Sequence, residues 1–157
     1  TVYGGGQEFG FRSGTENVYG IAAFGQAVRE HYNSLKDEVS YMQELKDYIV
    51  AGLEKIDGVS VNRPKNSACH IISVTVKGIR SETMLHFLSS KGICVSSGSA
   101  CSSNDTSKKT TALEAFGLSA DEADSTVRVS LCPQNTTAEA DALFVAVAEA
   151  TSHLAKK

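Results

Sequence analysis

The sequence predicts an α+β protein, a two-layer sandwich in which a short sheet packs against helices. Three observations predict this fold. The 157 residues suffice for one domain, or for one domain plus part of another. Hydrophobic residues make up 41% of the chain, enough for a core. Long segments with helical apolar spacing alternate with short β-branched runs, in the order ααβ, βαβ, βα, without an internal repeat.

The first elements are a glycine-rich loop and two helices. Five of the first 14 residues are glycine, which is typical of a sharply turning loop. A helix is predicted from Thr15 or Glu16 to about Asn33. Ser34 can cap a second helix that Gly58 ends. The second helix has an apolar stripe with three- and four-residue steps: Leu35, Val39, Met42, Leu45, Ile49, Leu53 and Ile56.

The middle of the chain predicts three strands and one helix. Strands are expected at 59–61, at 69–76, where β-branched residues are frequent, and at 93–95. The helix begins at Ser81 and ends at Gly92. The side chains expected to face inward are Ile72, Val74, Val76, Met84, Leu85 and Leu88.

The last part of the chain predicts a helical turn at 113–116, a strand at 126–131 and a final helix. Thr136 and Glu139 form a possible capping box for that helix. The run 102–111 is rich in polar residues, and we expect it to be mobile. The buried side of the final helix is expected to consist of Ala140, Leu143, Phe144, Val147 and Leu154.

Composition narrows the class of protein. The net charge is −3, and the 15 lysines and arginines form no basic run, so we expect no nucleic-acid partner. No apolar stretch approaches the ~20 residues that span a bilayer, so no membrane partner is expected. The start of the chain lacks the regions of a signal peptide, and the four cysteines include no C-x-x-C pair or zinc-finger spacing. We therefore expect a reducing, cytoplasmic compartment and no metal site.

Cys101 stands apart from the other three cysteines. Cys94 and Cys132 fall in or beside predicted strands and are expected to be buried, and Cys69 fits either role. Cys101 lies in the small, polar segment 95–105, which offers no apolar packing. It is therefore either a reactive thiol or an incidental surface cysteine. A phosphatase loop would need an arginine shortly after it, and a papain-like protease a histidine base; neither is indicated.

Arg128 is the second candidate site residue. Alternation along the strand puts Val127 and Val129 on one face and Thr126, Arg128 and Ser130 on the other. Arg128 is thus either a solvated edge arginine or a fork for a carboxylate, which a guanidinium matches bidentately.

Thr15 is the third candidate. It follows the glycines at a predicted helix start, where backbone N–H groups and a hydroxyl can bind phosphate. The pattern contains no G-x-x-x-x-G-K, so it is not a P-loop.

Three segments together resemble the cysteine desulfurases, pyridoxal 5'-phosphate (PLP) enzymes that remove sulfur from cysteine. GGGQEFGFRSGTENV at 4–18 resembles the family's segment after the cofactor lysine. SSGSACSS at 96–103 resembles its catalytic-cysteine loop, and GLSADEADSTVRVSLCPQNTTAEAD at 117–141 resembles its substrate-arginine segment. The order and the spacing also match, over essentially the whole chain.

The resemblance implies a role for each candidate. Cys101 matches the nucleophile that takes the sulfur as a persulfide, and Arg128 matches the residue that binds the α-carboxylate of L-cysteine. Thr15 matches the threonine that reaches the PLP phosphate of the neighbouring subunit, which implies a homodimer. The long polar loop after Cys101 is similar to the iron–sulfur-assembly branch, so scaffold or sulfur-acceptor proteins are the implied partners.

One departure from the family pattern is large. The Schiff-base lysine stands in a Ser-x-His-Lys stretch that this chain lacks. The resemblance therefore implies the small C-terminal domain of a fold-type I PLP-dependent transferase at 34–157, preceded at 1–33 by a tail of the large PLP-binding domain and an interdomain helix. We expect this chain alone to be inactive. The alternatives are a selenocysteine lyase or another class V aminotransferase, and a non-catalytic module that binds an acceptor protein.

Overall fold

The computed structural model describes residues 2–97 and 112–155, and it divides into two units, Thr1–Asp37 and Glu38–Lys157. Each unit is described by itself. The predicted division after residue 33 falls close to the start of α2 (Leu35–Leu53). Cys101 and the segment 102–111, which was expected to be mobile, lie outside the described residues.

The first unit contains a tight turn and one helix. The turn holds the short 3-10 helix η1 (Glu8–Gly10), which the sequence analysis did not predict. The hydroxyl of Ser13 donates to the carbonyl of Gly5 at 2.6 Å and closes the turn. Helix α1 (Val18–Tyr32) begins later than predicted, because the side chain of Asn17 caps it by accepting from the N–H of Gly20 at 3.0 Å.

The apolar side of α1 is exposed. None of the described residues in the range 2–33 is buried. The exposed fraction is 64% for Val18, 62% for Ile21 and 72% for Phe24. Helix α2 is present as predicted. The apolar stripe of α2 is buried from Met42 onward, whereas Leu35 and Val39, at its start, are exposed.

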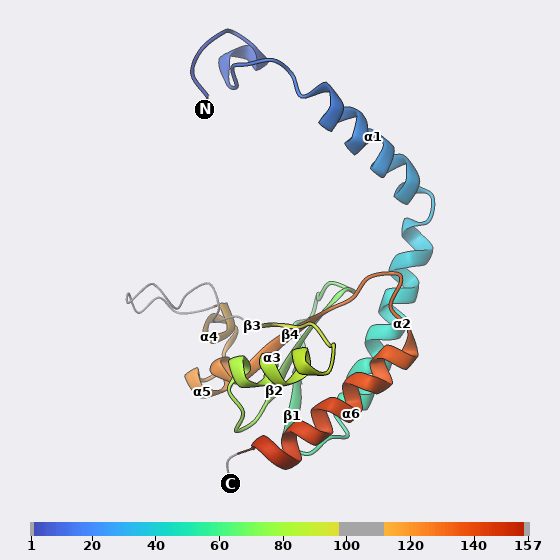
Figure 1. Cartoon of the computed structure of the whole chain (residues 1–157), viewed down its shortest axis with the longest axis vertical. Helices are drawn as coiled ribbons and strands as arrows, with labels where there is room; N and C mark the ends of the chain where they lie inside the picture. The colour runs from blue at the N-terminus through green and yellow to red at the C-terminus, as the bar shows by residue number, and fades with distance from the viewer. Residues whose placement is uncertain (1, 98–111, 156–157) are drawn as a thin grey trace. The chain divides into compact units, whose positions relative to one another are not determined.

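The second unit is built on a four-stranded antiparallel sheet, in the order β1-β2-β4-β3 (Figure 1). The strands are β1 (Val59–Asn62), β2 (Ile71–Val76), β3 (Ser96–Ser97) and β4 (Thr126–Ser130). The prediction for β2 was two residues too long at its start, because 69–70 form a turn before the strand.

The strand predicted at 93–95 is misplaced, because the structure has β3 at Ser96–Ser97. Helix α3 (Ser81–Ser90) is capped by Lys91 and followed by Gly92, whose φ is 77°. The N–H of Ile93 reaches back to the carbonyl of Leu88 at 3.0 Å, and the N–H of Gly92 to that of Ser89 at 3.0 Å. This is the Schellman arrangement of a helix end. It uses the N–H of Ile93 for the cap, so the strand begins only at Ser96.

The remaining helices are α4 (Ala112–Phe116), α5 (Ala120–Asp124) and α6 (Thr137–Leu154). The capping box predicted from Thr136 and Glu139 is confirmed. Ser119 and Glu122 form a second box that starts α5, a helix absent from the prediction. In both boxes, hydrogen bonds to the glutamate carboxylate lower its pKa. The largest effect on the pKa of Glu122 comes from the side chain of Ser119, and the largest effect on the pKa of Glu139 comes from the backbone N–H of Thr136.

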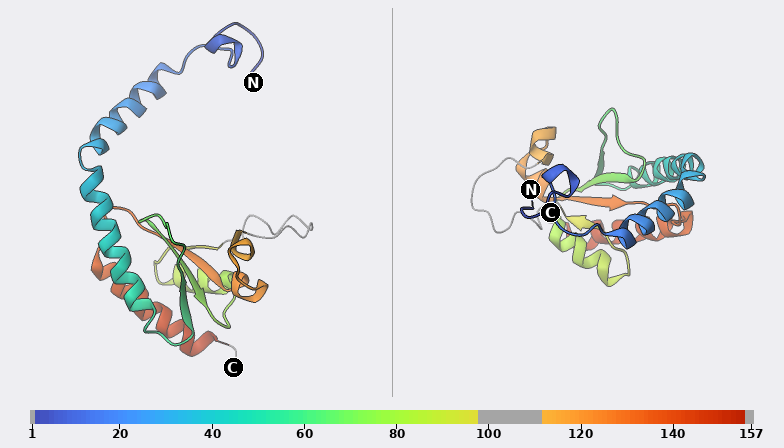
Figure 2. Two further views of the ribbon diagram at one scale, coloured as in Figure 1. Left: turned by 180° about the vertical axis from the view of Figure 1, so that it is seen from behind. Right: turned by 90° about the horizontal axis from the view of Figure 1, so that it is seen from above.

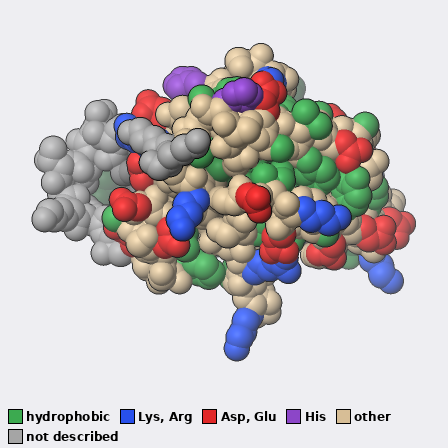
Figure 3. Space-filling model, turned by 90° about the horizontal axis from the view of Figure 1, so that it is seen from below, with side chains coloured by type: hydrophobic (Ala, Val, Ile, Leu, Met, Phe, Trp, Pro, Cys, Tyr) green, Lys and Arg blue, Asp and Glu red, His purple; other side chains and the backbone are tan. Residues whose placement is uncertain are grey.

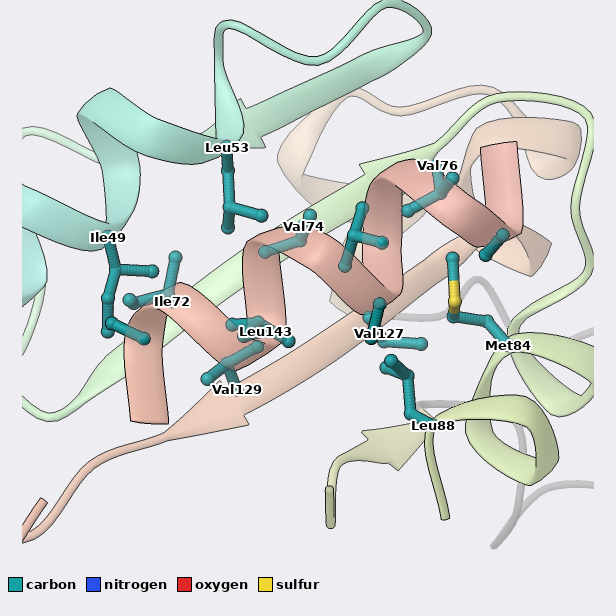
Figure 4. Close-up of a cluster of buried hydrophobic side chains, with 14 of the residues drawn as sticks. Ile49, Leu53, Ile72, Val74, Val76, Met84, Leu88, Val127, Val129 and Leu143 are labelled. Atoms are coloured by element: carbon teal, nitrogen blue, oxygen red, sulfur yellow. The ribbon is translucent and has the colours of Figure 1, made fainter. Parts of the chain in front are cut away.

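The core lies between one face of the sheet and the helices α2, α3 and α6. Figure 4 shows Leu53 and Leu143 converging on the strand side chains, with Met84 and Leu88 beside them. Figure 2 shows α3 and α6 on the same side of the sheet. Leu85, predicted to face inward, is only half-buried. The largest of the fully buried apolar side chains are Leu53, Ile72, Val74, Val76, Met84 and Leu88. A mixed α/β fold with a short sheet and helices is therefore confirmed.

The surface carries interspersed charges. Figure 3 shows acidic and basic side chains side by side on the face that it draws. Among the residues that the structure describes, three ion pairs join Arg63 to Glu54, Arg80 to Asp124 and Lys91 to Glu149. Within the described residues, no helix is both long and apolar enough to cross a bilayer.

Candidate functional site

Arg128 lies on the polar face of β4, opposite the core. The alternation predicted for this strand is confirmed: Val127 and Val129 are buried, while Arg128 and Ser130 are exposed. Thr126 is buried as well, because α5 covers that end of the strand and the hydroxyl of Thr126 donates to the carbonyl of Glu122 at 2.6 Å. Arg128 is exposed to solvent, but it does not lie on an edge strand, since β4 lies between β2 and β3.

A hydrogen-bonded network fixes the polar face beside Arg128. The amide of Asn62 on β1 donates to the hydroxyls of Ser73 at 3.1 Å and Thr75 at 2.9 Å on β2. The hydroxyls of Thr75 and Thr126 lie 2.7 Å apart. The network therefore ties β1, β2 and β4 together through side chains as well as through the backbone ladder, and it continues to α5 through Thr126.

The guanidinium of Arg128 contacts β3, the strand on the opposite side of β4 from β2. Its Nη2 donates to Oγ of Ser96 at 3.2 Å, and the two residues are direct partners in the β3–β4 register. On the β2 side the register partner of Arg128 is Ser73. A guanidinium has five N–H donors, so this contact leaves donors for a further acceptor. The site can bind an anion that fits a planar fork, such as a carboxylate.

Thr15 belongs to the first unit, at the end of the glycine-rich turn. Its carbonyl accepts from Nη1 of Arg12 at 2.9 Å, and the same nitrogen donates to the carbonyl of Gly14 at 3.2 Å. Thr15 is exposed and precedes the α1 cap by two residues. Arg128 belongs to the second unit. Cys101 lies outside the described residues.

Two of the other cysteines differ from their predicted roles. Cys94 and Cys132, which were expected to be buried, are both exposed, and Cys69 is half-buried. Cys94 follows the α3 cap rather than lying in a strand, and Cys132 follows β4 in a turn. There the thiol of Cys132 donates to Oδ1 of Asn135 at 3.3 Å. No group of three or more histidine, cysteine, aspartate or glutamate side chains suited to a metal lies in the ranges 2–97 and 112–155.

Two of the described lysines are held by other groups of the protein. Lys46 is buried, but its ammonium donates to the hydroxyl of Ser67 at 2.8 Å and the carbonyl of Ala68 at 2.7 Å. These bonds tie α2 to the turn before β2. Lys91 pairs with Glu149. The ammonium groups of Lys46 and Lys91 are therefore both engaged in contacts within the second unit.

Sequence reasoning missed Ser96, Ser73 and Asn62 as members of this site. Ser73 and Asn62 belong to no motif, and Ser96 was noted only as the first residue of the segment 96–103 that resembles the catalytic-cysteine loop. Only the register of the four strands brings them to the same face as Arg128. The alternation of β2, with Ser73 and Thr75 opposite the apolar side chains, was the one signal available in the sequence.

Comparison with known proteins assigns the chain to a family. Residues 4–143 match the family described as aminotransferase class-V, so the chain belongs to that family, which uses PLP. It is 36% identical over 155 residues to a NifS/IcsS protein homolog of Lactobacillus delbrueckii subsp. bulgaricus. It is 32% identical over 154 residues to a protein of Methanosarcina thermophila named cysteine desulfurase IscS. Each alignment covers 98% of this chain, but 40% and 38% of the relatives.

Solved structures give the same result. A NifS-like protein matches with a TM-score of 0.81 and 33% identity over 98% of this chain. A NifS-like protein of Rickettsia africae matches with a TM-score of 0.79 and 29% identity over 94%. This chain covers 38% of each of those two chains. The resemblance to cysteine desulfurases read from three segments is thus confirmed, and the chain spans about two-fifths of the length of the relatives it matches.

Proposed function

We propose that the chain is the C-terminal part of a PLP-dependent cysteine desulfurase, comprising its small domain and a tail of the large one. Such an enzyme converts L-cysteine to L-alanine and keeps the sulfur as a persulfide on its own cysteine. The observation that carries the proposal is the position of Arg128, exposed on a central strand with its guanidinium contacting Ser96. Relatives named cysteine desulfurase support it.

Two residues of this chain, Arg128 and Cys101, each have one task in the proposed reaction. Arg128 binds the α-carboxylate of L-cysteine with two parallel N–H groups and so orients the substrate. The thiolate of Cys101 attacks the substrate sulfur, so that an S–S bond forms as the C–S bond breaks. The electron pair of the broken bond passes to the β-carbon, which takes up a proton, and L-alanine results. PLP, when bound, supplies the electron sink for breaking the C–S bond.

The proposal extends to assembly and partners. The hydroxyl of Thr15 contacts the phosphate of the PLP in the neighbouring subunit, so the enzyme is a homodimer. The persulfide on Cys101 passes its sulfur to a scaffold or another acceptor protein, for iron–sulfur cluster assembly or for tRNA thiolation. The Schiff-base lysine is not in these 157 residues, so this chain alone is expected to be inactive.

The test uses the polypeptide encoded by the complete gene, loaded with PLP, and measures L-alanine released from L-cysteine. Cys101→Ala should abolish persulfide formation and turnover, whereas Cys94→Ala, which changes another cysteine outside the proposed chemistry, should leave both unchanged. Arg128→Lys should raise KM about ten-fold or more, because a lysine cannot form the two parallel bonds.

Two results would contradict the proposal. Full turnover of L-cysteine by Cys101→Ala would favour a selenocysteine lyase or another class V aminotransferase. L-alanine or sulfide released by the 157-residue chain alone, with added PLP, would show that the catalytic groups are misassigned.

A further inference from the structure

The polar face of the sheet holds one row of side chains that crosses all four strands. Register pairs place Asn62 on β1 opposite Ser73 on β2, Ser73 opposite Arg128 on β4, and Arg128 opposite Ser96 on β3. Within this row the amide of Asn62 donates to Ser73, and the guanidinium of Arg128 donates to Ser96. Arg128 is therefore flanked by a hydroxyl on each neighbouring strand.

We propose that Ser96 is a positioning residue that orients the guanidinium of Arg128 for the carboxylate of the substrate. This inference rests on the function proposed above and adds a residue to it. The hydroxyl oxygen of Ser96 accepts from Nη2 of Arg128, which fixes the plane of the fork and leaves its other donors for a ligand. Ser96 itself does not need to touch the substrate.

The chemistry of the acceptor distinguishes Arg128 from other arginines of the second unit. Arg63 and Arg80 each face a carboxylate, from Glu54 and Asp124, which neutralises the positive charge. The partner of Arg128 is a neutral hydroxyl. A neutral acceptor restrains the long side chain without cancelling the charge, so the full charge remains available to an anion.

Ser96 can serve as a fixed point because β3 is held on both faces of the sheet. The strand has only two residues and lies at the edge, where the ladder with β4 is its backbone pairing. The neighbouring Ser97 faces the other side, and its hydroxyl lies 3.1 Å from that of Ser81, a buried residue at the start of α3. Bonds from Arg128 and from α3 thus fasten the two residues from opposite directions.

The experiment compares three variants in the complete, PLP-loaded polypeptide. Ser96→Ala removes the acceptor, Ser96→Thr keeps it, and Ser130→Ala removes an exposed hydroxyl from the same face of β4 as a matched control. Two quantities are measured: KM and kcat for L-cysteine, and the NMR signal of the Arg128 Nε–H. Ser96→Ala should raise KM about five-fold with kcat within about two-fold, since one charge-assisted hydrogen bond is lost. It should also move or broaden the Arg128 signal. Ser96→Thr and Ser130→Ala should match the wild type in both.

The outcomes separate this inference from the proposed function. An unchanged KM and an unchanged Arg128 signal in Ser96→Ala would overturn the positioning role. An equal rise of KM in Ser96→Thr would also overturn it, because the effect would then come from the strand and not from the hydroxyl. If the wild type does not turn over L-cysteine, the proposed function fails. A shift of the Arg128 signal confined to Ser96→Ala would still support the positioning role.

Discussion

The phenolic hydroxyl of Tyr48 on α2 donates a hydrogen bond of 2.6 Å to Oδ1 of Asp141 on α6. The ring of Tyr48 also packs against Phe144, with the ring centroids 5.7 Å apart. The hydrogen bond to Asp141 raises the pKa of Tyr48 above its ordinary value of 10.0. The two long helices are therefore joined by a contact whose strength depends on a proton.

Replacement of Tyr48 by phenylalanine should change the alkaline stability of the protein. Because the pKa of Tyr48 is raised in the folded state, its stabilising contribution is present below pH 10.0 and is lost as the pH rises through the folded-state value. The wild type should therefore exceed Tyr48→Phe in urea midpoint at pH 8, and the difference should shrink above pH 10. Tyr19→Phe, at a tyrosine that is 91% exposed, is the control. A difference that stays constant with pH would show that the hydrogen bond is not the cause.

Addition of one methyl group at Gly52 should destabilise the protein. A Cβ at this position of α2 would lie 2.6 Å from Cε1 of Phe144 on α6, so the phenylalanine ring would have to move. We expect Gly52→Ala to lower the free energy of unfolding by about 1–3 kcal/mol, although alanine favours helix. Gly25→Ala in α1 is the matched control, since nothing lies within 4 Å of its new Cβ. It should increase helicity measured by circular dichroism. Equal effects at the two positions would contradict the close packing of α2 and α6.

The capping box of α6 predicts a loss of stability in acid. Hydrogen bonds from the backbone of Thr136 and the side chain of Asn135 lower the pKa of Glu139 below its ordinary value of 4.5. Its contribution is present above pH 4.5 and is lost as the pH falls through the lower folded-state value. Glu139→Gln should therefore be less stable than the wild type at pH 7 and should approach it as the pH falls below the lowered pKa of Glu139, where both side chains are neutral. Urea midpoints measured from pH 7 into acid follow the effect, with Glu44→Gln as an exposed control on α2. A gap that does not narrow as the pH falls would argue against the carboxylate as its source.

Removal of the buried Thr126 hydroxyl should lower the free energy of unfolding. Thr126→Val keeps the shape of the side chain but leaves Thr75 and the carbonyl of Glu122 each without one partner. We expect a loss of about 1–3 kcal/mol, typical of a buried group left unsatisfied. Thr126→Ser keeps the hydroxyl and gives up one methyl, so its loss should be about 0.8 kcal/mol. The prediction fails if the serine variant is the less stable of the two in urea.

The sequence predicted the elements that periodicity and caps define. The stripe of α2, the capping box of α6 and the alternation of β4 are all present, because each depends on neighbours along the chain. The start of β3 was misplaced because the Schellman end of α3 uses the N–H of Ile93, a competition between helix cap and strand that periodicity does not express. Helix α5 was missed although Ser119 and Glu122 carry the same signature as the box that was recognised.

The candidate site was predictable only in part. The face on which Arg128 lies follows from alternation within one strand, and its identity as a substrate arginine follows from resemblance. Its position on a central strand does not follow, because the order of strands depends on contacts between residues far apart in the sequence. For the same reason, nothing in the local sequence could pair Arg128 with Ser96.

The central position of β4 has a consequence for how tightly a ligand can bind. Neighbours on both sides already hold the backbone that carries Arg128, so an incoming anion orders a side chain and not a segment of chain. Most of the conformational entropy of the backbone at this site is lost when the sheet folds, and not when a ligand binds. Affinity at this position should therefore respond to changes in the reach and tilt of one guanidinium far more than to the mobility of the strand beneath it.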